Sequence, residues 1–93
     1  AIQHPIALEG YRRDREGIDW ADAGVLLLPC GRSAHLEAGF MAGQGKPVYV
    51  LALEPTEPEL MNHLLAGICC DVGELIVRLR DAELHLVALR GIE

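Results

Sequence analysis

Two short apolar runs on either side of a helix-length segment constrain this fold more than any other feature. Residues 25–28 read Val-Leu-Leu-Leu, and residues 47–53 read Pro-Val-Tyr-Val-Leu-Ala-Leu. Uninterrupted apolar residues are typical of strands that are covered on both faces, as in parallel sheets. The pattern therefore predicts a strand–helix–strand unit with a right-handed crossover, in which the first run is a central strand.

Helical patterns surround these runs. Apolar residues recur at loosely helical spacing over residues 6–21, although Gly10 and Gly17 weaken the pattern. Between the two runs, Ser33 is placed to cap a second helix, which Gly45 ends. These segments predict one helix before the first strand and one after it.

The alternation continues to the end of the chain. Residues 58–67 predict a helix with Pro58 in its first turn and Gly67 beyond its end, and residues 68–71 are short enough for one more strand. An amphipathic helix is expected from Val72 onward. Helices and strands thus alternate throughout, which predicts an α/β layered fold with a small parallel sheet flanked by helices.

The length of the chain favours one domain and an assembly of several copies. With 93 residues, residues 1–93 are expected to form a single domain whose thin core oligomerisation would help to stabilise. Three strands are also few for a parallel sheet, so we expect strands before Ala1 or strands supplied by a partner chain. We therefore expect a homo-oligomer.

The charge balance limits the partners. The chain has 8 Lys and Arg residues against 14 Asp and Glu residues, a formal charge of −6. Nucleic acid polymers and anionic membranes are bound by arrays of basic side chains, so neither is an expected partner. A single Arg can still bind a small anion, and a nucleoside or nucleotide stays compatible with this composition.

The cysteines indicate the cellular compartment and argue against a metal site. Cys30, Cys69 and Cys70 are an odd number, and two are adjacent, which suits neither a disulfide framework nor zinc. We expect a reduced, cytoplasmic setting without a metal or other cofactor. Since no apolar run approaches the roughly 20 residues of a membrane span, no such span is expected.

Chemistry is expected where the first strand meets the second helix, because parallel α/β sheets bind ligands at this end of their strands. Gly31 permits close approach of a ligand, Arg32 and Ser33 are hydrogen-bond donors, and a helix start favours an anion. The turn is a candidate phosphate or carboxylate cradle. The alternative is an ordinary capped turn.

Three side chains are candidates for substrate chemistry. Glu37 lies in the first part of the second helix, where an ionised carboxylate aimed at the same crevice could attack an anomeric carbon; alternatively it only favours the helix start. Asp14 reaches the crevice if the first helix runs back across it, and is otherwise solvated surface. Tyr11 is either a residue at the edge of the core or a sugar contact.

A cysteine nucleophile is a further alternative. Cys30 lies between a strand and a helix start, a setting that can activate a thiol. His35 is its candidate base if the rotation of the helix brings the two together.

Residues 19–52 resemble the core of the nucleoside 2-deoxyribosyltransferase-like family. In that family an aspartate, an apolar strand, a glycine–serine turn, an E-x-G helix, a G-K pair and a second apolar strand follow in this order. The His-Leu-Glu-Ala-Gly segment, residues 35–39, is the most specific part. The resemblance extends over residues 9–80, and Pro-Glu-Leu-Met-Asn-His-Leu looks like the continuation in small bacterial and phage members.

The resemblance implies a flavodoxin-like fold and cleavage or transfer of the N-glycosidic bond of deoxyribonucleosides or their 5′-monophosphates. It implies Glu37 as the nucleophile, Asp14 as the proton donor to the leaving base, and Gly31 and Ser33, with Arg32 beside them, as the phosphate contacts. The alternative is a nucleotide-binding or interaction module of the same fold without turnover.

Two departures from the family pattern matter. The family's first strand and its glycine loop, which help to hold the base, have no counterpart in this sequence. Cys30 and Gly31 also stand where the transferase branch commonly has an aspartate, which favours a hydrolase-like member.

Overall fold

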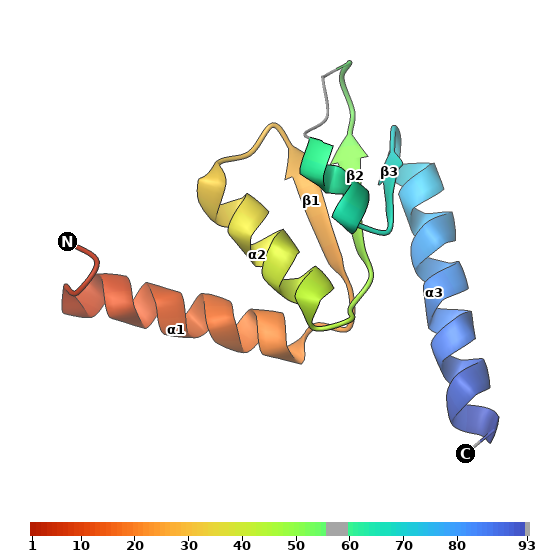
Figure 1. Ribbon diagram of the computed structural model, residues 1–93, viewed down its shortest axis with the longest axis horizontal. Coiled ribbons are helices and arrows are strands. Elements are labelled where there is room, and N and C mark those ends of the chain that lie inside the picture. The colour runs from red at the N-terminus through yellow and green to blue at the C-terminus, as the bar shows by residue number, and fades with distance from the viewer. Residues whose placement is uncertain (56–59, 93) are drawn as a thin grey trace.

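The computed structural model describes residues 1–55 and 60–92, and shows the α/β alternation that the sequence predicts (Figure 1). The elements are α1 (Pro5–Trp20), β1 (Gly24–Leu28), α2 (Arg32–Gly43), β2 (Val48–Ala52), a 3₁₀ helix η1 (Leu60–Leu64), β3 (Gly67–Cys69) and α3 (Val72–Ile92).

The segment between β2 and β3 differs from the prediction. The helix expected over residues 58–67 is a single 3₁₀ segment, Leu60–Leu64, within the described residues, and Gly67 opens β3 instead of following a helix. The proposed position of Pro58 in a first helical turn lies outside the described residues.

The sheet is parallel, and β2 is its central strand. The strand order is β1-β2-β3, and Leu26 of β1 lies opposite Val50 of β2, which lies opposite Ile68 of β3. The prediction that residues 25–28 form a central strand is therefore wrong: within the described part of the chain, β1 is an edge strand. The apolar run indicated burial on both faces, but Val25 and Leu27 are 45% and 53% exposed.

Helices cover both faces of the sheet (Figure 1). On one face α2 packs on the first two strands, and on the other α3 packs on the last two. The α2 side buries Leu26, Ala38, Met41, Val48 and Val50; the α3 side buries Tyr49, Leu51, Cys69 and Leu75. This is a flavodoxin-like α/β layout with a three-stranded sheet, as the sequence predicts.

The turns at the two ends of α2 fix its direction. The N-cap is Gly31, without a side-chain hydrogen bond, so the prediction that Ser33 caps this helix is wrong; Ser33 lies within the first turn. At the other end Gly45 has φ +82°, a left-handed conformation that glycine adopts without strain. The predicted helix stop at Gly45 is confirmed.

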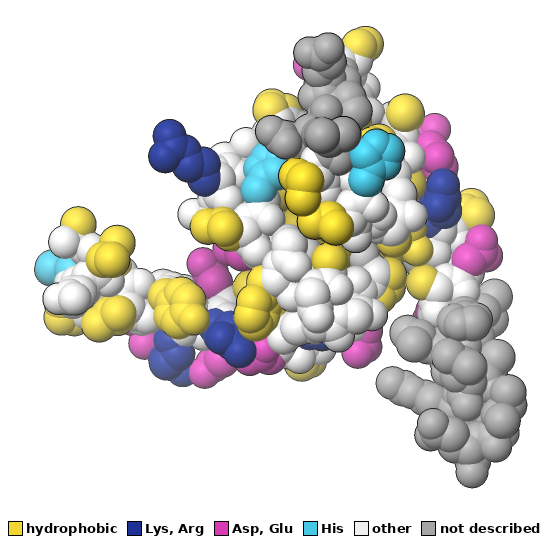
Figure 2. All heavy atoms as spheres, in the orientation of Figure 1, with side chains coloured by type: hydrophobic (Ala, Val, Ile, Leu, Met, Phe, Trp, Pro, Cys, Tyr) yellow, Lys and Arg dark blue, Asp and Glu magenta, His cyan; other side chains and the backbone are white. Residues whose placement is uncertain are grey.

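Helix α1 extends from the body of the molecule and is held mainly at its C-terminal end (Figure 1). None of its residues is buried, and hydrophobic side chains lie exposed along it (Figure 2). Lys46 Nζ donates to the carbonyl oxygens of Ile18 at 2.6 Å and Asp19 at 3.4 Å, and Gln44 Nε2 donates to Asp19 Oδ1 at 3.3 Å. A cation at a helix C-terminus also complements the helix dipole.

We expect Lys46→Met to loosen α1 while preserving the rest of the fold. The substitution keeps an apolar stem but removes a charged donor to two helix-terminal carbonyls, at a cost of about 1–2 kcal/mol. Hydrogen exchange by mass spectrometry should show faster exchange in α1 and unchanged exchange in β2. Arg80→Met, at an exposed position of α3, is the matched control. Equal α1 exchange in both variants would contradict this role for Lys46.

The described residues contain no helix that is both long and apolar enough to cross a membrane.

Candidate functional site

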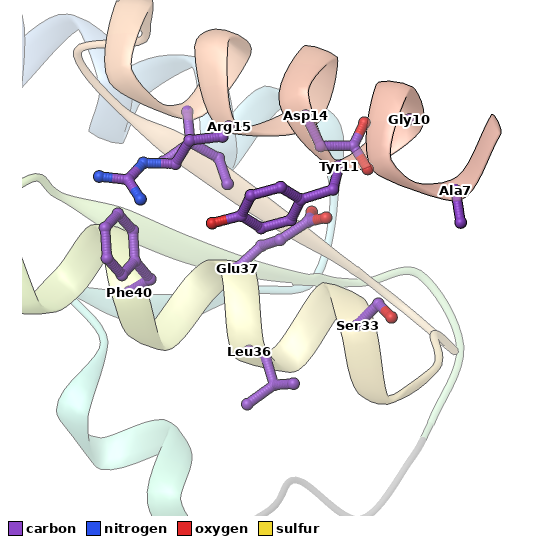
Figure 3. Close-up of a pocket in the computed structure, with 10 residues that line it drawn as sticks. Ala7, Gly10, Tyr11, Asp14, Arg15, Ser33, Leu36, Glu37 and Phe40 are labelled. Atoms are coloured by element: carbon purple, nitrogen blue, oxygen red, sulfur yellow. The ribbon is translucent and has the colours of Figure 1, made fainter. Parts of the chain in front are cut away.

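A cleft of about 610 Å³ lies between α1 and the N-terminal half of α2 (Figure 3). Ligand clefts commonly measure 300–1,000 Å³, so its size suits a nucleoside. It lies along α2, the helix that follows β1, and not at the carboxyl ends of the strands, where parallel α/β folds commonly bind ligands. Those ends line a separate hollow of about 320 Å³. The residues that line the cleft between α1 and α2 are Ala7, Gly10, Tyr11, Asp14, Arg15, Ile18, Ser33, Leu36, Glu37 and Phe40.

The two predicted catalytic carboxylates line this cleft from opposite helices. Glu37 projects from α2 toward α1, while Asp14 and Tyr11 project from α1 into the same space (Figure 3). Glu37 is half-buried, whereas Asp14 is exposed and Tyr11 is 64% exposed. The cleft thus holds a partly shielded carboxylate, a solvent-accessible carboxylate and an aromatic ring.

The other charged residues of α1 are paired with one another. Arg12 forms ion pairs with Glu9 and Glu16, and Arg13 pairs with Glu9. In the part of the chain that the structure describes, neither Asp14 nor Glu37 makes an ion pair. The two cleft carboxylates are therefore not neutralised by protein cations and remain open to a substrate.

Arg15 connects the two walls of the cleft. Its guanidinium carbon lies 4.6 Å from the centre of the Phe40 ring on α2, a cation–π contact. Its Nε lies 3.2 Å from both carboxylate oxygens of Asp19. Hydrogen bonding with Tyr11, and next with Asp19, raises the pKa of Arg15 above its ordinary value. Arg15 therefore carries a permanent positive charge at one side of the cleft.

The predicted anion cradle is divided between two clefts. Ser33 lines the cleft of Glu37, but Gly31 and Arg32 line another of about 710 Å³ on a different side of α2. The rotation between consecutive helical residues, about 100°, sends their side chains to different faces. Asp14, Tyr11, Ser33 and Glu37 therefore share one cleft, and Gly31 and Arg32 do not line it.

The alternative pair of Cys30 and His35 is close in space but poorly arranged for proton transfer. His35 Nδ1 lies 3.5 Å from Cys30 Sγ and 2.9 Å from the carbonyl oxygen of Gly31. To donate to that carbonyl, Nδ1 must carry a proton, and it then cannot accept one from the thiol. Both side chains line the second cleft, away from Glu37.

The sequence analysis missed Arg15, Leu36 and Phe40 as cleft residues. Helical spacing would have found them. From Tyr11, the face of α1 continues through positions 14, 15 and 18, and from Ser33 the face of α2 continues through positions 36, 37 and 40. The residues that share a helix face with Glu37 or Asp14 are thus a better prediction of the cleft lining than the residues of the turn between β1 and α2.

Among the side chains that the structure describes, those of residues 1–55 and 61–83, no group of three or more His, Cys, Asp and Glu residues is arranged to hold a metal ion. Comparison with known proteins found no matching family model, curated protein or solved structure.

Proposed function

We propose that this chain cleaves the N-glycosidic bond of a nucleoside or nucleoside 5′-monophosphate, with Glu37 as the nucleophile. The observation that carries the proposal is that Glu37 and Asp14 line the same cleft from two successive helices, α2 and α1. Most enzymes that hydrolyse glycosidic bonds use two carboxyl groups, one on either side of the bond that is cleaved. The resemblance of residues 19–52 to the nucleoside 2-deoxyribosyltransferase-like family supports the same assignment.

The reaction proceeds in two displacements at C1′ of the sugar. A Glu37 carboxylate oxygen attacks C1′, the C1′–N bond breaks, and its electron pair leaves with the base, which takes a proton from Asp14. Water then attacks C1′ and transfers a proton to the Asp14 carboxylate while Glu37 leaves. Each carboxyl group returns to its starting state, and the configuration at C1′ is retained.

The remaining lining suits the other parts of such a substrate. Tyr11, Leu36 and Phe40 give the cleft a largely apolar wall, against which a planar base can pack. Ser33 lies in the first turn of α2, whose free N–H groups favour an anion. Arg15 lies at the other end of the cleft, over the Phe40 ring (Figure 3). We assign the base to the apolar wall and a 5′-phosphate to the Ser33 turn.

A screen of deoxynucleosides and their 5′-monophosphates for released base tests the proposal. Chromatographic detection of free base with the wild-type chain is the expected result. Tight nucleotide binding without base release, weakened by Ser33→Ala but not by Glu37→Gln, would select a non-catalytic nucleotide-binding module instead. A chain that neither binds nor cleaves any member of the panel would contradict both functions.

We expect Asp14→Asn to slow base release in proportion to how much the base needs protonation. General acid catalysis contributes roughly 10²–10⁴-fold, so a natural base should leave slower by about that factor. With a nitrophenyl deoxyriboside, whose nitrophenolate departs without a proton, the first release of nitrophenolate in a single turnover should be nearly as fast as in the wild type. A single turnover is measured because Asp14 also accepts the proton of water in the second displacement. An equal loss with both substrates would show that Asp14 does not act as the acid.

A further inference from the structure

The order of the side chains along the cleft between α1 and α2 matches the order of the parts of a nucleotide. Ser33 lines one end of the cleft, and Arg15 and Phe40 line the other (Figure 3). Glu37 and Asp14 lie between these ends. In a nucleoside 5′-monophosphate the sugar likewise separates the phosphate from the base. With the phosphate at the Ser33 turn and C1′ beside Glu37, the base lies at the end that Arg15 and Phe40 form.

The guanidinium group of Arg15 is held at this end of the cleft, but most of its donors are not used by the protein. Nε lies 3.2 Å from both carboxylate oxygens of Asp19, and the guanidinium carbon lies 4.6 Å from the centre of the Phe40 ring. The two Nη atoms have four of the five N–H donors of an arginine. Even with the Tyr11 hydroxyl group as one partner, each Nη atom keeps a proton for a ligand. The side chain is 45% exposed, so a ligand can reach these protons.

Two donors at a fixed spacing select a base by its acceptors. Arginine binds guanine through O6 and N7 with two parallel hydrogen bonds. Adenine has an amino group where guanine has O6, cytosine also presents an amino group at this edge, and thymine presents a single oxygen. A donor that meets an amino group stays unpaired, so a 6-oxopurine satisfies both Nη atoms and the other bases do not.

We propose that Arg15 makes the cleft selective for nucleotides of the 6-oxopurines guanine and hypoxanthine. One Nη atom donates to O6 of the base and the other donates to N7. The ring nitrogen N3, on the opposite edge of the purine, remains free for the proton that Asp14 delivers, so base selection and protonation use different atoms. The inference rests on the proposed function, because the position of the base follows from that of Glu37.

Calorimetric titration of the Glu37→Gln chain with the 5′-monophosphates of deoxyguanosine, deoxyinosine and deoxyadenosine tests this selectivity without turnover. The two 6-oxopurine nucleotides should bind about tenfold more tightly than the adenine nucleotide, or better. Adding Arg15→Lys keeps the charge but removes the fork of donors, and should abolish the preference by weakening only the 6-oxopurine nucleotides. Arg13→Lys, the same change on α1 outside the cleft lining, is the matched control and should retain the preference.

Equal affinity for the three nucleotides, or a preference that survives Arg15→Lys, would overturn the proposal. Equal weakening of all three by Arg15→Lys would also overturn it, because Arg15 would then bind the phosphate that they share.

The 7-deaza analogue of deoxyguanosine 5′-monophosphate provides a test that needs no substitution at Arg15. In this analogue C–H replaces N7 while O6 is kept, so it should bind about tenfold more weakly than the parent nucleotide. Unchanged affinity would refute the bond to N7. Selective binding without base release would support the selectivity and refute the proposed function, whereas release from guanine and adenine nucleotides bound equally well would do the reverse. Absence of binding by every nucleotide would refute both.

Discussion

Glu37→Gln should lower the rate of base release by about 10³-fold or more and leave the fold intact. A glutamine amide has nearly the shape of the carboxylate but does not attack C1′, so the covalent route is lost. The fold should be preserved because Glu37 makes no side-chain hydrogen bond or ion pair with the rest of the described chain. Initial rates of base release and a circular dichroism spectrum measure the two effects.

The matched control is Glu83→Gln, which makes the same chemical change at an exposed position of α3. It should retain the wild-type rate. If the Glu37 variant released base as fast as this control, Glu37 would not be the nucleophile and the proposed mechanism would fail.

Val50→Asp should prevent the chain from folding. Val50 is 0% exposed and lies in the middle of β2, opposite Leu26 on one side and Ile68 on the other. An unpaired carboxylate buried there costs several kcal/mol, a large share of the roughly 5–15 kcal/mol that stabilises a whole domain. Far-UV circular dichroism and urea denaturation should show an unfolded chain without a cooperative transition.

Val77→Asp makes the same change at a 57% exposed position and should shift the free energy of unfolding by no more than about 1 kcal/mol. A Val50→Asp protein that unfolds cooperatively at the wild-type urea midpoint would contradict the assignment of β2 as the buried centre of the sheet.

The elements that could be predicted are those that short-range sequence patterns determine. The apolar run of residues 47–53 gave β2 because a strand covered on both faces has no polar positions. Gly45, with φ +82°, marks the stop of α2 because the left-handed conformation disfavours other residues. The resemblance indicated that Asp14 and Glu37 share one cleft, and helical spacing, had it been applied, would have added Phe40 to the residues that line it.

The features that were missed depend on contacts between elements. The run Val25–Leu28 is as apolar as a central strand, but which strands flank it is a property of the whole sheet. Likewise, Arg32 and Ser33 are neighbours in sequence, yet the position of α1 on one side of α2 puts only Ser33 in the cleft of Glu37. Sequence spacing fixes positions on one helix, but it does not fix which neighbour that helix faces.

The stereochemistry of base displacement tests the covalent role of Glu37 most directly. In buffer containing methanol, the alcohol competes with water for the glycosyl-enzyme, and the methyl glycoside of the sugar does not interconvert between anomers afterwards. Two displacements through Glu37 predict that NMR spectroscopy of the product from a β-nucleoside shows the β-methyl glycoside. The α-methyl glycoside would mean a single direct displacement and would contradict the account.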